Sequence, residues 1–195
     1  CNAIRVTHNP AAPELIEIAN EKGMMLIDEA FDMWVMEKNG NVNDYSTWFE
    51  VEIGEDNAIV GGEPDMTWAE FDIKAMANQD KNSPAVIMYS LGNEIFEGTA
   101  NDRASEYPGI ARELCTWLTE VDDTRPPTFG QNTNNESTAY KVADVLKEFG
   151  GISGVNYANT SRFDTWVNRG LLVYYSETAS AVNSRGVYDR KGSQS

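Results

Sequence analysis

The chain is poor in the residues that usually build metal sites and disulfide frameworks. It has one histidine and two cysteines in 195 residues, which excludes a histidine-rich metal centre and a disulfide scaffold. It also has few cations: 15 Lys and Arg stand against 31 Asp and Glu, for a formal net charge of −16. So acidic a chain repels nucleic acid and anionic membranes, and we expect neither as a partner. No run approaches the roughly 18 apolar residues that a membrane span needs.

What the chain does have is the composition of a globular domain with a core. Hydrophobic residues make up 41% of the sequence and aromatic residues 10%. Strand-like and helix-like runs alternate along it, and strict alternation favours a parallel sheet with right-handed crossovers. Five helical stretches are expected between six strands. The strands are expected at residues 2–7, 24–27, 85–91, 127–129, 152–157 and 171–176.

Two parallel architectures fit this alternation, an open doubly wound sheet and a (β/α)8 barrel. Polar side chains at strand ends favour the barrel, because barrel active sites lie at the carboxyl ends of the strands. No glycine-rich phosphate loop follows the first strand, which weakens the nucleotide-binding alternative. These strand-end residues are His8, Asp28 with Glu29, Asn93 with Glu94, Asn156 with Tyr157, and Glu177.

We therefore predict an α/β fold that is a partial (β/α)8 TIM barrel. Six strands cannot close an eight-stranded ring, and about 250 residues is typical of the complete fold. Residues 1–195 are accordingly expected to be a fragment of one barrel domain, with strands 2 to 7 present and strands 1 and 8 missing.

Glu94 and Glu177 each lie at the carboxyl end of a predicted strand. In an eight-stranded ring these two strands lie across from each other. Two convergent carboxylates are the minimum apparatus for cleaving a glycosidic bond, since one protonates the leaving oxygen and the other attacks the anomeric carbon. The alternative is that each carboxylate only caps the helix that follows it. The pairing of the two in this register favours catalysis.

Arg5 is expected to point into the barrel. Strand alternation sends Ile4 and Val6 to one side and Arg5 to the other, and the branched pair suits packing against helices. A buried guanidinium needs an anionic partner, for which Glu177 and Asp28 are the candidates. A purely structural ion pair is the alternative.

Four segments resemble the catalytic barrel of glycoside hydrolase family 2. They are NAIRVTHNP at 2–10, DEAFDMW at 28–34, NSPAVIMYSLGNE at 82–94 and SETAS at 176–180. The resemblance implies a retaining, exo-acting β-glycosidase with Glu94 as acid/base and Glu177 as nucleophile. The SETAS form is most similar to bacterial β-galactosidases, which implies terminal β-galactosides as substrates. A β-glucuronidase or β-mannosidase of the same family stays open, as does a non-catalytic carbohydrate-binding barrel.

Five further side chains are expected to contact the substrate or support the site. The resemblance implies that Asn93 donates to the sugar 2-hydroxyl and that His8 contacts a sugar hydroxyl. It also makes Trp34 a stacking wall for the pyranose and Asp32 a hydroxyl-binding residue. Tyr157 ends the strand beside that of Glu177, so its hydroxyl is expected to reach that carboxylate. Packing alone is the alternative for Trp34 and Tyr157, and a lone histidine is often structural.

No cofactor and no metal are expected. Magnesium-dependent relatives have a His and a Glu near the acid/base, and with His8 the sole histidine that site is not recognisable here. Residues 30–66 are too long for an ordinary loop and are expected to form an active-site wall. The expected partners are a β-linked oligosaccharide or glycoside and the family's β-sandwich domains, which this sequence lacks. A homo-oligomer stays open, as does a cytoplasmic, periplasmic or secreted location in a bacterium.

Overall fold

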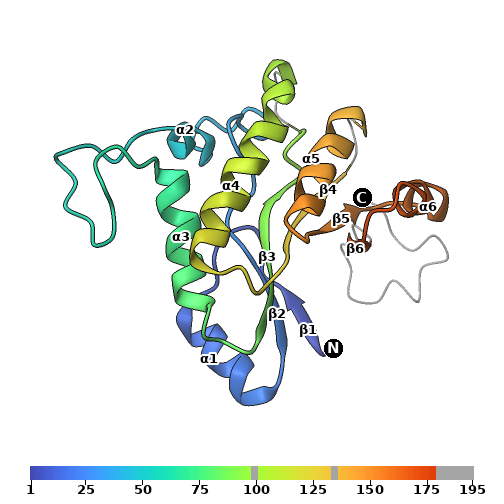
Figure 1. Ribbon diagram of the computed structural model, residues 1–195, viewed down its shortest axis with the longest axis horizontal. Helices are drawn as coiled ribbons and strands as arrows, with labels where there is room; N and C mark the ends of the chain where they lie inside the picture. The colour runs from blue at the N-terminus through green and yellow to red at the C-terminus, as the bar shows by residue number, and fades with distance from the viewer. Residues whose placement is uncertain (98–100, 133–135, 179–195) are drawn as a thin grey trace.

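The computed structural model describes residues 1–97, 101–132 and 136–178. Six strands form one sheet in the order β1-β2-β3-β4-β5-β6, and all neighbours are parallel. The predicted α/β fold, a partial (β/α)8 barrel, is confirmed (Figure 1). The strands are β1 (Ala3–Arg5), β2 (Met25–Glu29), β3 (Val86–Asn93), β4 (Pro127–Gln131), β5 (Ile152–Asn156) and β6 (Val173–Glu177).

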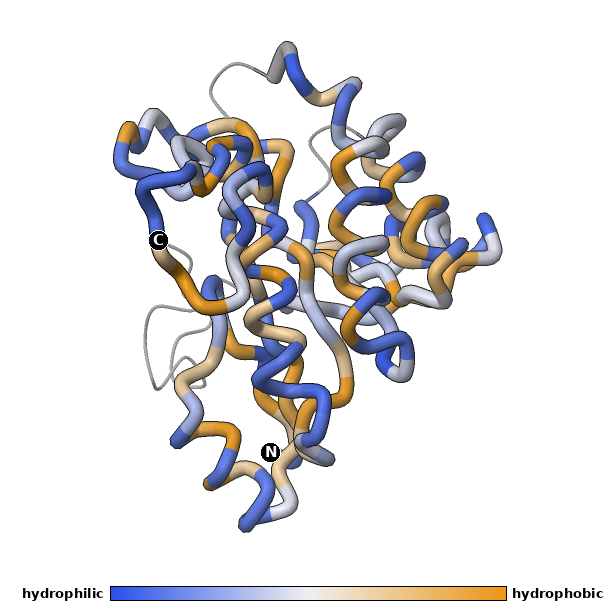
Figure 2. The backbone as a smooth tube through the Cα atoms, turned by 60° about the vertical axis from the view of Figure 1, so that its left-hand side comes forward, coloured by the Kyte–Doolittle hydropathy of each residue, from blue (hydrophilic) through white to orange (hydrophobic). Residues whose placement is uncertain are grey.

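Helices connect the strands and pack on one side of the sheet, where α3 contacts α4 and α4 contacts α5. Hydrophobic and hydrophilic residues alternate along them, as amphipathic helices require (Figure 2). They are α1 (Pro13–Lys22), α2 (Ser46–Phe49), α3 (Trp68–Asp80), α4 (Tyr107–Val121), α5 (Glu136–Glu148) and α6 (Thr160–Asn168), with a 3-10 helix, η1, at Asn101–Glu106.

Local sequence signals set the helix ends. Pro13 starts α1, and Gly23 ends it in the left-handed conformation with φ 67°, from which its N–H reaches the carbonyl of Ala19. The Thr67 side chain accepts a hydrogen bond from the backbone N–H of Glu70 at the start of α3. These are the capping roles that the sequence predicts at both positions.

The two faces of the sheet differ in chemistry. The face toward the helices is apolar, with Leu26, Tyr89 and Leu91 fully buried. The opposite face becomes polar toward the carboxyl ends of the strands, where Ser90 and Asn93 are also buried. Ser90 and Asn93 are three residues apart, and the register shift between them in the pairing of β3 with β4 brings both side chains to the face of Arg5 and Glu29.

The segment between β2 and α3, residues 30–66, divides into two parts. Its first part stays at the carboxyl end of the sheet, where Asp32 and Lys38 contact each other. Its later part runs away from the sheet as a long excursion (Figure 1), and Val60 there is 99% exposed. The whole segment was expected to form a wall of the active site, but only its first part approaches the polar face.

A pair of buried carboxyl groups lies on the helix side of the sheet. Asp28 of β2 and Asp80 of α3 are both fully buried. Burial, followed by the hydrogen bond to Asp28, raises the pKa of Asp80 to about 8. Oδ2 of each carboxyl group is buried without another hydrogen-bond partner, so we expect the two groups to share a proton. The other Asp28 oxygen, Oδ1, accepts from the backbone N–H groups of Ala11 and Glu29 at 2.9 and 3.0 Å.

The shared proton should make stability depend on pH. The pKa of Asp80 is raised above its unfolded value of about 4, so the native state holds a proton that the unfolded state releases. Stability is therefore expected to fall as pH rises from about 4 toward 8. Asp80→Asn supplies a donor that cannot ionise. It should raise the midpoint of thermal unfolding of the intact protein at pH 8.5 and change it little at pH 5.

The control is Asp123→Asn, since Asp123 is an exposed carboxylate in the turn after α4. It should leave the unfolding midpoint unchanged at both pH values. An equal effect of Asp80→Asn at pH 5 and pH 8.5 would show that the pair does not share a proton.

Candidate active site

Arg5, at the end of β1, is the centre of the polar face. Its guanidinium bonds Glu29 at 2.6 Å, Glu177 at 2.8 Å and the Asn93 side-chain oxygen at 3.0 Å. The inward direction of Arg5 and its pairing with Glu177 are as predicted. The other expected partner was Asp28, and that prediction is wrong. Asp28 points to the helices, and its neighbour Glu29 points inward, because side chains alternate along β2.

Glu29 binds Arg5 in the place that was expected for Asp28. Its carboxylate is fully buried. Oε2 accepts from Arg5 and from the Ser90 hydroxyl at 2.5 Å, and Oε1 lies 2.7 Å from Nδ1 of His8. Burial would lower the pKa of Arg5, but the charge of Glu29 and the hydrogen bonds to Glu177 and Glu29 together outweigh it and raise that pKa. The hydrogen bond to Glu29 is also the main cause of a raised pKa at His8.

Glu94 follows β3 directly and is 7% exposed. Its Oε1 accepts from Nδ2 of Asn156 at 3.0 Å, and its Oε2 lies 3.3 Å from the ammonium of Lys38. Its backbone holds a positive φ of 49° and donates to the carbonyl of Gly130 at 2.7 Å. Lys38 also donates to Oδ1 of Asp32 at 3.1 Å. The acid is therefore held from two sides, by an amide and by a cation.

A third carboxyl group lies beside Glu94. Burial, and then the negative charge of Glu94, raise the pKa of Glu97. The Lys38 ammonium lies 4.0 Å from Glu97, and the Asn132 side chain donates to the same carboxyl group. One ammonium thus faces three carboxyl groups at this end of the sheet.

Glu177 ends β6, and its side chain is 24% exposed. Arg5 binds its Oε1, and the Tyr157 hydroxyl donates to its Oε2. Partial burial alone would raise the pKa of Glu177, but the hydrogen bonds from Tyr157 and Arg5 hold that pKa below its usual range. The predicted contact between Tyr157 and Glu177 is present.

One hydrogen-bond network connects the two acids. Nδ2 of Asn156 donates to Glu94 and to Oδ1 of Asn93, both at 3.0 Å. That same Asn93 oxygen accepts from Arg5, which binds Glu177. Glu94 and Glu177 therefore lie at one edge of the sheet, linked through three side chains.

Gly130 of β4 leaves room for this network. A Cβ atom built there would lie 2.7 Å from Nη2 of Arg5 and 3.1 Å from the side-chain oxygens of Asn93 and Asn156. Any side chain at this position would displace the guanidinium. At this position β4 therefore contributes space, and no side chain, to the site.

The family model for the TIM barrel domain of glycosyl hydrolases family 2 matches residues 1–169. The chain belongs to this family. A β-galactosidase of Bacteroides ovatus, BoGH2A, is 28% identical over 96% of this chain and 23% of its own length. A putative β-glucuronidase of Formosa agariphila is 30% identical over 58% of this chain and 9% of its own length.

Solved structures agree with this assignment. The crystal structure of a family 2 member from Bacteroides cellulosilyticus superposes with a TM-score of 0.71 at 30% identity, over 91% of this chain and 20% of that one. A β-glycosidase from Bacteroides vulgatus gives a TM-score of 0.67 at 25% identity, over 96% of this chain and 20% of that one. The family 2 domain described here thus spans about a quarter or less of these relatives.

Two of the expected substrate contacts lie at the rim of this family 2 site. His8 is held by Glu29, and Asp32 accepts from Nδ2 of Asn93 at 3.2 Å. Asn93 itself is buried, with both polar atoms of its amide bonded. Ala179 and Ser180, the last residues of the SETAS motif, lie outside the described residues.

Trp34 is not a wall of the site in this structure, and that expectation is wrong. Its side chain is fully buried, and its indole N–H donates to the carbonyl of Leu91 at 2.7 Å. The ring packs edge-to-face on Tyr107, with centroids 5.6 Å apart. A ring buried on all sides cannot offer a face to a sugar, so Trp34 anchors the start of the 30–66 segment to the core.

Lys38 is a site residue that no pattern in the sequence marks, since it lies in a segment without helical or strand periodicity.

The described residues contain no group of three or more His, Cys, Asp or Glu side chains placed to hold a metal ion. The carboxyl groups of Asp32, Glu94 and Glu97 instead surround the Lys38 ammonium. Within the described ranges, no helix has the length and apolar character to cross a membrane.

Proposed function

We propose that the intact protein is a retaining, exo-acting β-glycosidase that hydrolyses terminal β-galactosides, with Glu94 as acid/base and Glu177 as nucleophile. The observation that carries the proposal is the network that ties a buried and an ion-paired carboxylate to one edge of the sheet. In retaining enzymes one carboxylate attacks the anomeric carbon while a second carboxyl group, close to it, protonates the leaving oxygen. The names of the β-galactosidase relatives support the choice of sugar.

The surroundings of Glu177 suit a nucleophile. Tyr157 and Arg5 lower its pKa, so it is ionised when substrate arrives and attacks the anomeric carbon. Forming the glycosyl ester removes its charge. Arg5 keeps a partner at that moment, because Glu29 binds the same guanidinium. The cation therefore is not left buried and unpaired during the covalent intermediate.

The surroundings of Glu94 suit a group that gives up and later takes a proton. Protonated, it donates to the leaving oxygen; ionised, it takes a proton from the water that hydrolyses the glycosyl ester. Glu97, with its raised pKa, is a neighbouring carboxyl group on which a proton can reside. The ammonium of Lys38 lies 3.3 Å from Glu94 and is its counter-ion after the proton has been given to the leaving oxygen.

An uncharged sugar fits the described site better than a uronic acid. Two cations of the described site are already paired with carboxylates: Arg5 with Glu29 and Glu177, and Lys38 with Asp32 and Glu94. A uronate that bound Arg5 or Lys38 would have to break one of these pairs. This supports a galactoside over a glucuronide.

The test is covalent trapping. The intact protein is incubated with 2-deoxy-2-fluoro-β-galactosyl fluoride, digested and mapped by mass spectrometry. We expect the label on Glu177 and loss of activity in step with labelling. Steady hydrolysis of β-galactosides with the label on another residue would overturn the nucleophile assignment. Turnover of β-glucuronides or β-mannosides in place of β-galactosides would overturn the choice of sugar.

Replacing Arg5 should impair the site through Glu177. Arg5→Met leaves Glu29 buried without its cation and removes one of the two groups that lower the pKa of Glu177. We expect kcat/KM for an aryl β-galactoside to fall about 100-fold or more, since one lost charge-assisted contact in a buried site is worth about 3 kcal/mol. The acidic limb of its pH profile should move to higher pH.

The matched control is Arg112→Met. Arg112 pairs with Glu148 on exposed helix surfaces, and surface pairs contribute little. This variant should keep both the rate and the pH profile. A fall in rate for Arg5→Met with an unmoved acidic limb would mean that Arg5 serves only the fold.

A further inference from the structure

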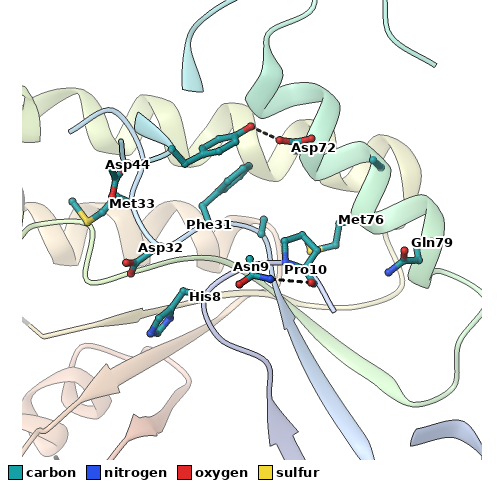
Figure 3. A pocket seen from close by; sticks show the side chains of 13 residues that line it. His8, Asn9, Pro10, Phe31, Asp32, Met33, Asp44, Asp72, Met76 and Gln79 are labelled. Carbon is teal, nitrogen blue, oxygen red and sulfur yellow. Dashed lines mark hydrogen bonds between the residues drawn. The ribbon is translucent and has the colours of Figure 1, made fainter. Parts of the chain in front are cut away.

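A cavity of about 390 Å³ lies beside the mouth of the site, between α3 and the first part of segment 30–66. Its volume is within the range of small-molecule sites. The close view shows Phe31 and Met76 at its centre, with His8 and Asp32 together at one side (Figure 3). None of the network that joins Glu94 to Glu177 lines it.

The cavity is continuous with the catalytic end of the sheet. His8 lines it and is hydrogen-bonded to Glu29, the partner of Arg5. Asp32 lines it too, and shares the Lys38 ammonium with Glu94. The cavity thus has one lining residue connected to Glu177, through Glu29 and Arg5, and one connected to Glu94, through Lys38.

The position of Glu94 determines which part of the substrate can reach the cavity. Glu94 must reach the oxygen that leaves with the aglycone, so the leaving group lies on the Glu94 side of the sugar. Asp32 stands on that side, bonded through Lys38. A leaving-group ring that extended past Asp32 would meet the other residues that line the cavity.

The lining has two kinds of surface. The interior is apolar, built from Phe31 stacked on Tyr45 with centroids 5.1 Å apart and from Met76. Hydrogen-bond acceptors stand around it. Among the described residues, every hydrogen bond to Asp32 goes to Oδ1, which leaves Oδ2 for a hydroxyl group, and the Gln79 side chain also faces the cavity.

The charge of the lining excludes anions. Asp32, Asp44 and Asp72 all contribute to it. Asp72 is the acceptor for the Tyr45 hydroxyl, and burial raises the pKa of both groups. The basic side chain in the lining, His8, is already bonded to Glu29. A sulfated, phosphorylated or uronate leaving group would therefore face these acids without an unpaired cation among the lining residues.

We propose that this cavity is the subsite for the leaving group, and that it selects a neutral ring with one apolar face and hydroxyl groups at its edge. A second hexose and a phenolic aglycone share this chemistry. The inference rests on the proposed function, because it assigns the part of the substrate that Glu94 releases.

The test fills the cavity from the helix side. Ala75 lines it and is exposed on α3, so Ala75→Trp blocks the space without removing a contact from the catalytic network. The matched control is Asn78→Trp, an exposed position on the same helix that does not line the cavity. Ala75→Leu gives a smaller obstruction, and thermal unfolding of each intact variant checks the fold.

Three substrates are compared: β-galactosyl fluoride, phenyl β-galactoside and a β-galactosyl-hexose disaccharide. Dividing each variant's kcat/KM by the wild-type value for the same substrate cancels differences in intrinsic reactivity. Ala75→Trp is expected to lower this quotient about tenfold or more for substrates with a ring, relative to the fluoride. Ala75→Leu should lie between, and Asn78→Trp should match wild type on all three.

The pattern across the ring substrates identifies the natural occupant. A selective loss on the disaccharide alone assigns the cavity to a second sugar, and a loss on the phenyl galactoside alone assigns it to a phenolic aglycone. Equal quotients on all three substrates for a folded Ala75→Trp variant overturn the subsite. A wild-type protein that hydrolyses none of the three, the fluoride included, overturns the proposed function and the subsite with it.

Discussion

Glu177→Gln is expected to lower kcat for β-galactoside hydrolysis by on the order of 10⁴-fold or more, the scale of loss when a covalent nucleophile is removed. The amide has the shape of the carboxylate but cannot attack the anomeric carbon. Its oxygen can still accept from Tyr157 or Arg5, which hold the side chain now, so the fold should survive. The measurement is steady-state hydrolysis of an aryl β-galactoside by the intact protein.

The control for this variant is Glu113→Gln. Glu113 is an exposed carboxylate on α4, and its neutralisation should change the rate less than twofold. Substrate binding should persist in Glu177→Gln, so a non-hydrolysed galactoside should still protect it from thermal unfolding. A rate within tenfold of wild type would exclude Glu177 as the nucleophile.

Glu94→Gln should show a different kind of loss, one that depends on the leaving group. Without a proton donor, hydrolysis of substrates with poor leaving groups is expected to slow by about 10³-fold, within the usual range for general acid catalysis. Activated substrates such as 2,4-dinitrophenyl β-galactoside leave unaided. With them the glycosyl-enzyme should accumulate, because the water that must cleave it has also lost its base.

Azide distinguishes this outcome from general damage. As an anion it needs no base, so it should restore turnover of the activated substrate and give the β-galactosyl azide. The same treatment should not restore Glu177→Gln, which forms no glycosyl-enzyme. If both variants respond to azide alike, the two roles are assigned wrongly.

The fold was predictable from short-range signals. Continuous apolar runs marked the buried strands, and turn and capping residues marked the ends of α1 and α3. Strict strand–helix alternation then leaves few topologies. The inward direction of Arg5 follows from the same alternation, as does the error over its partner: a shift of one residue separates Asp28 from Glu29 and sends the side chain to the other face.

The loop contributions to the site were not predictable in this way. Segment 30–66 has no helical or strand period, so nothing in the sequence says which of its side chains turn inward. Trp34 turns into the core and Lys38 turns toward Glu94. Both orientations depend on the path of the whole segment across the strand ends, which is set by tertiary packing.

The ion pair between Arg5 and Glu177 joins the first and last strands of the sheet across a sequence separation of 172 residues. Flattening the sheet would pull these two side chains apart and leave the core between sheet and helices largely intact. The charge state of Glu177 is therefore coupled to the curvature of the β-sheet. A chain in which the curl is incomplete would keep this core but lose the ion pair that helps to lower the pKa of Glu177.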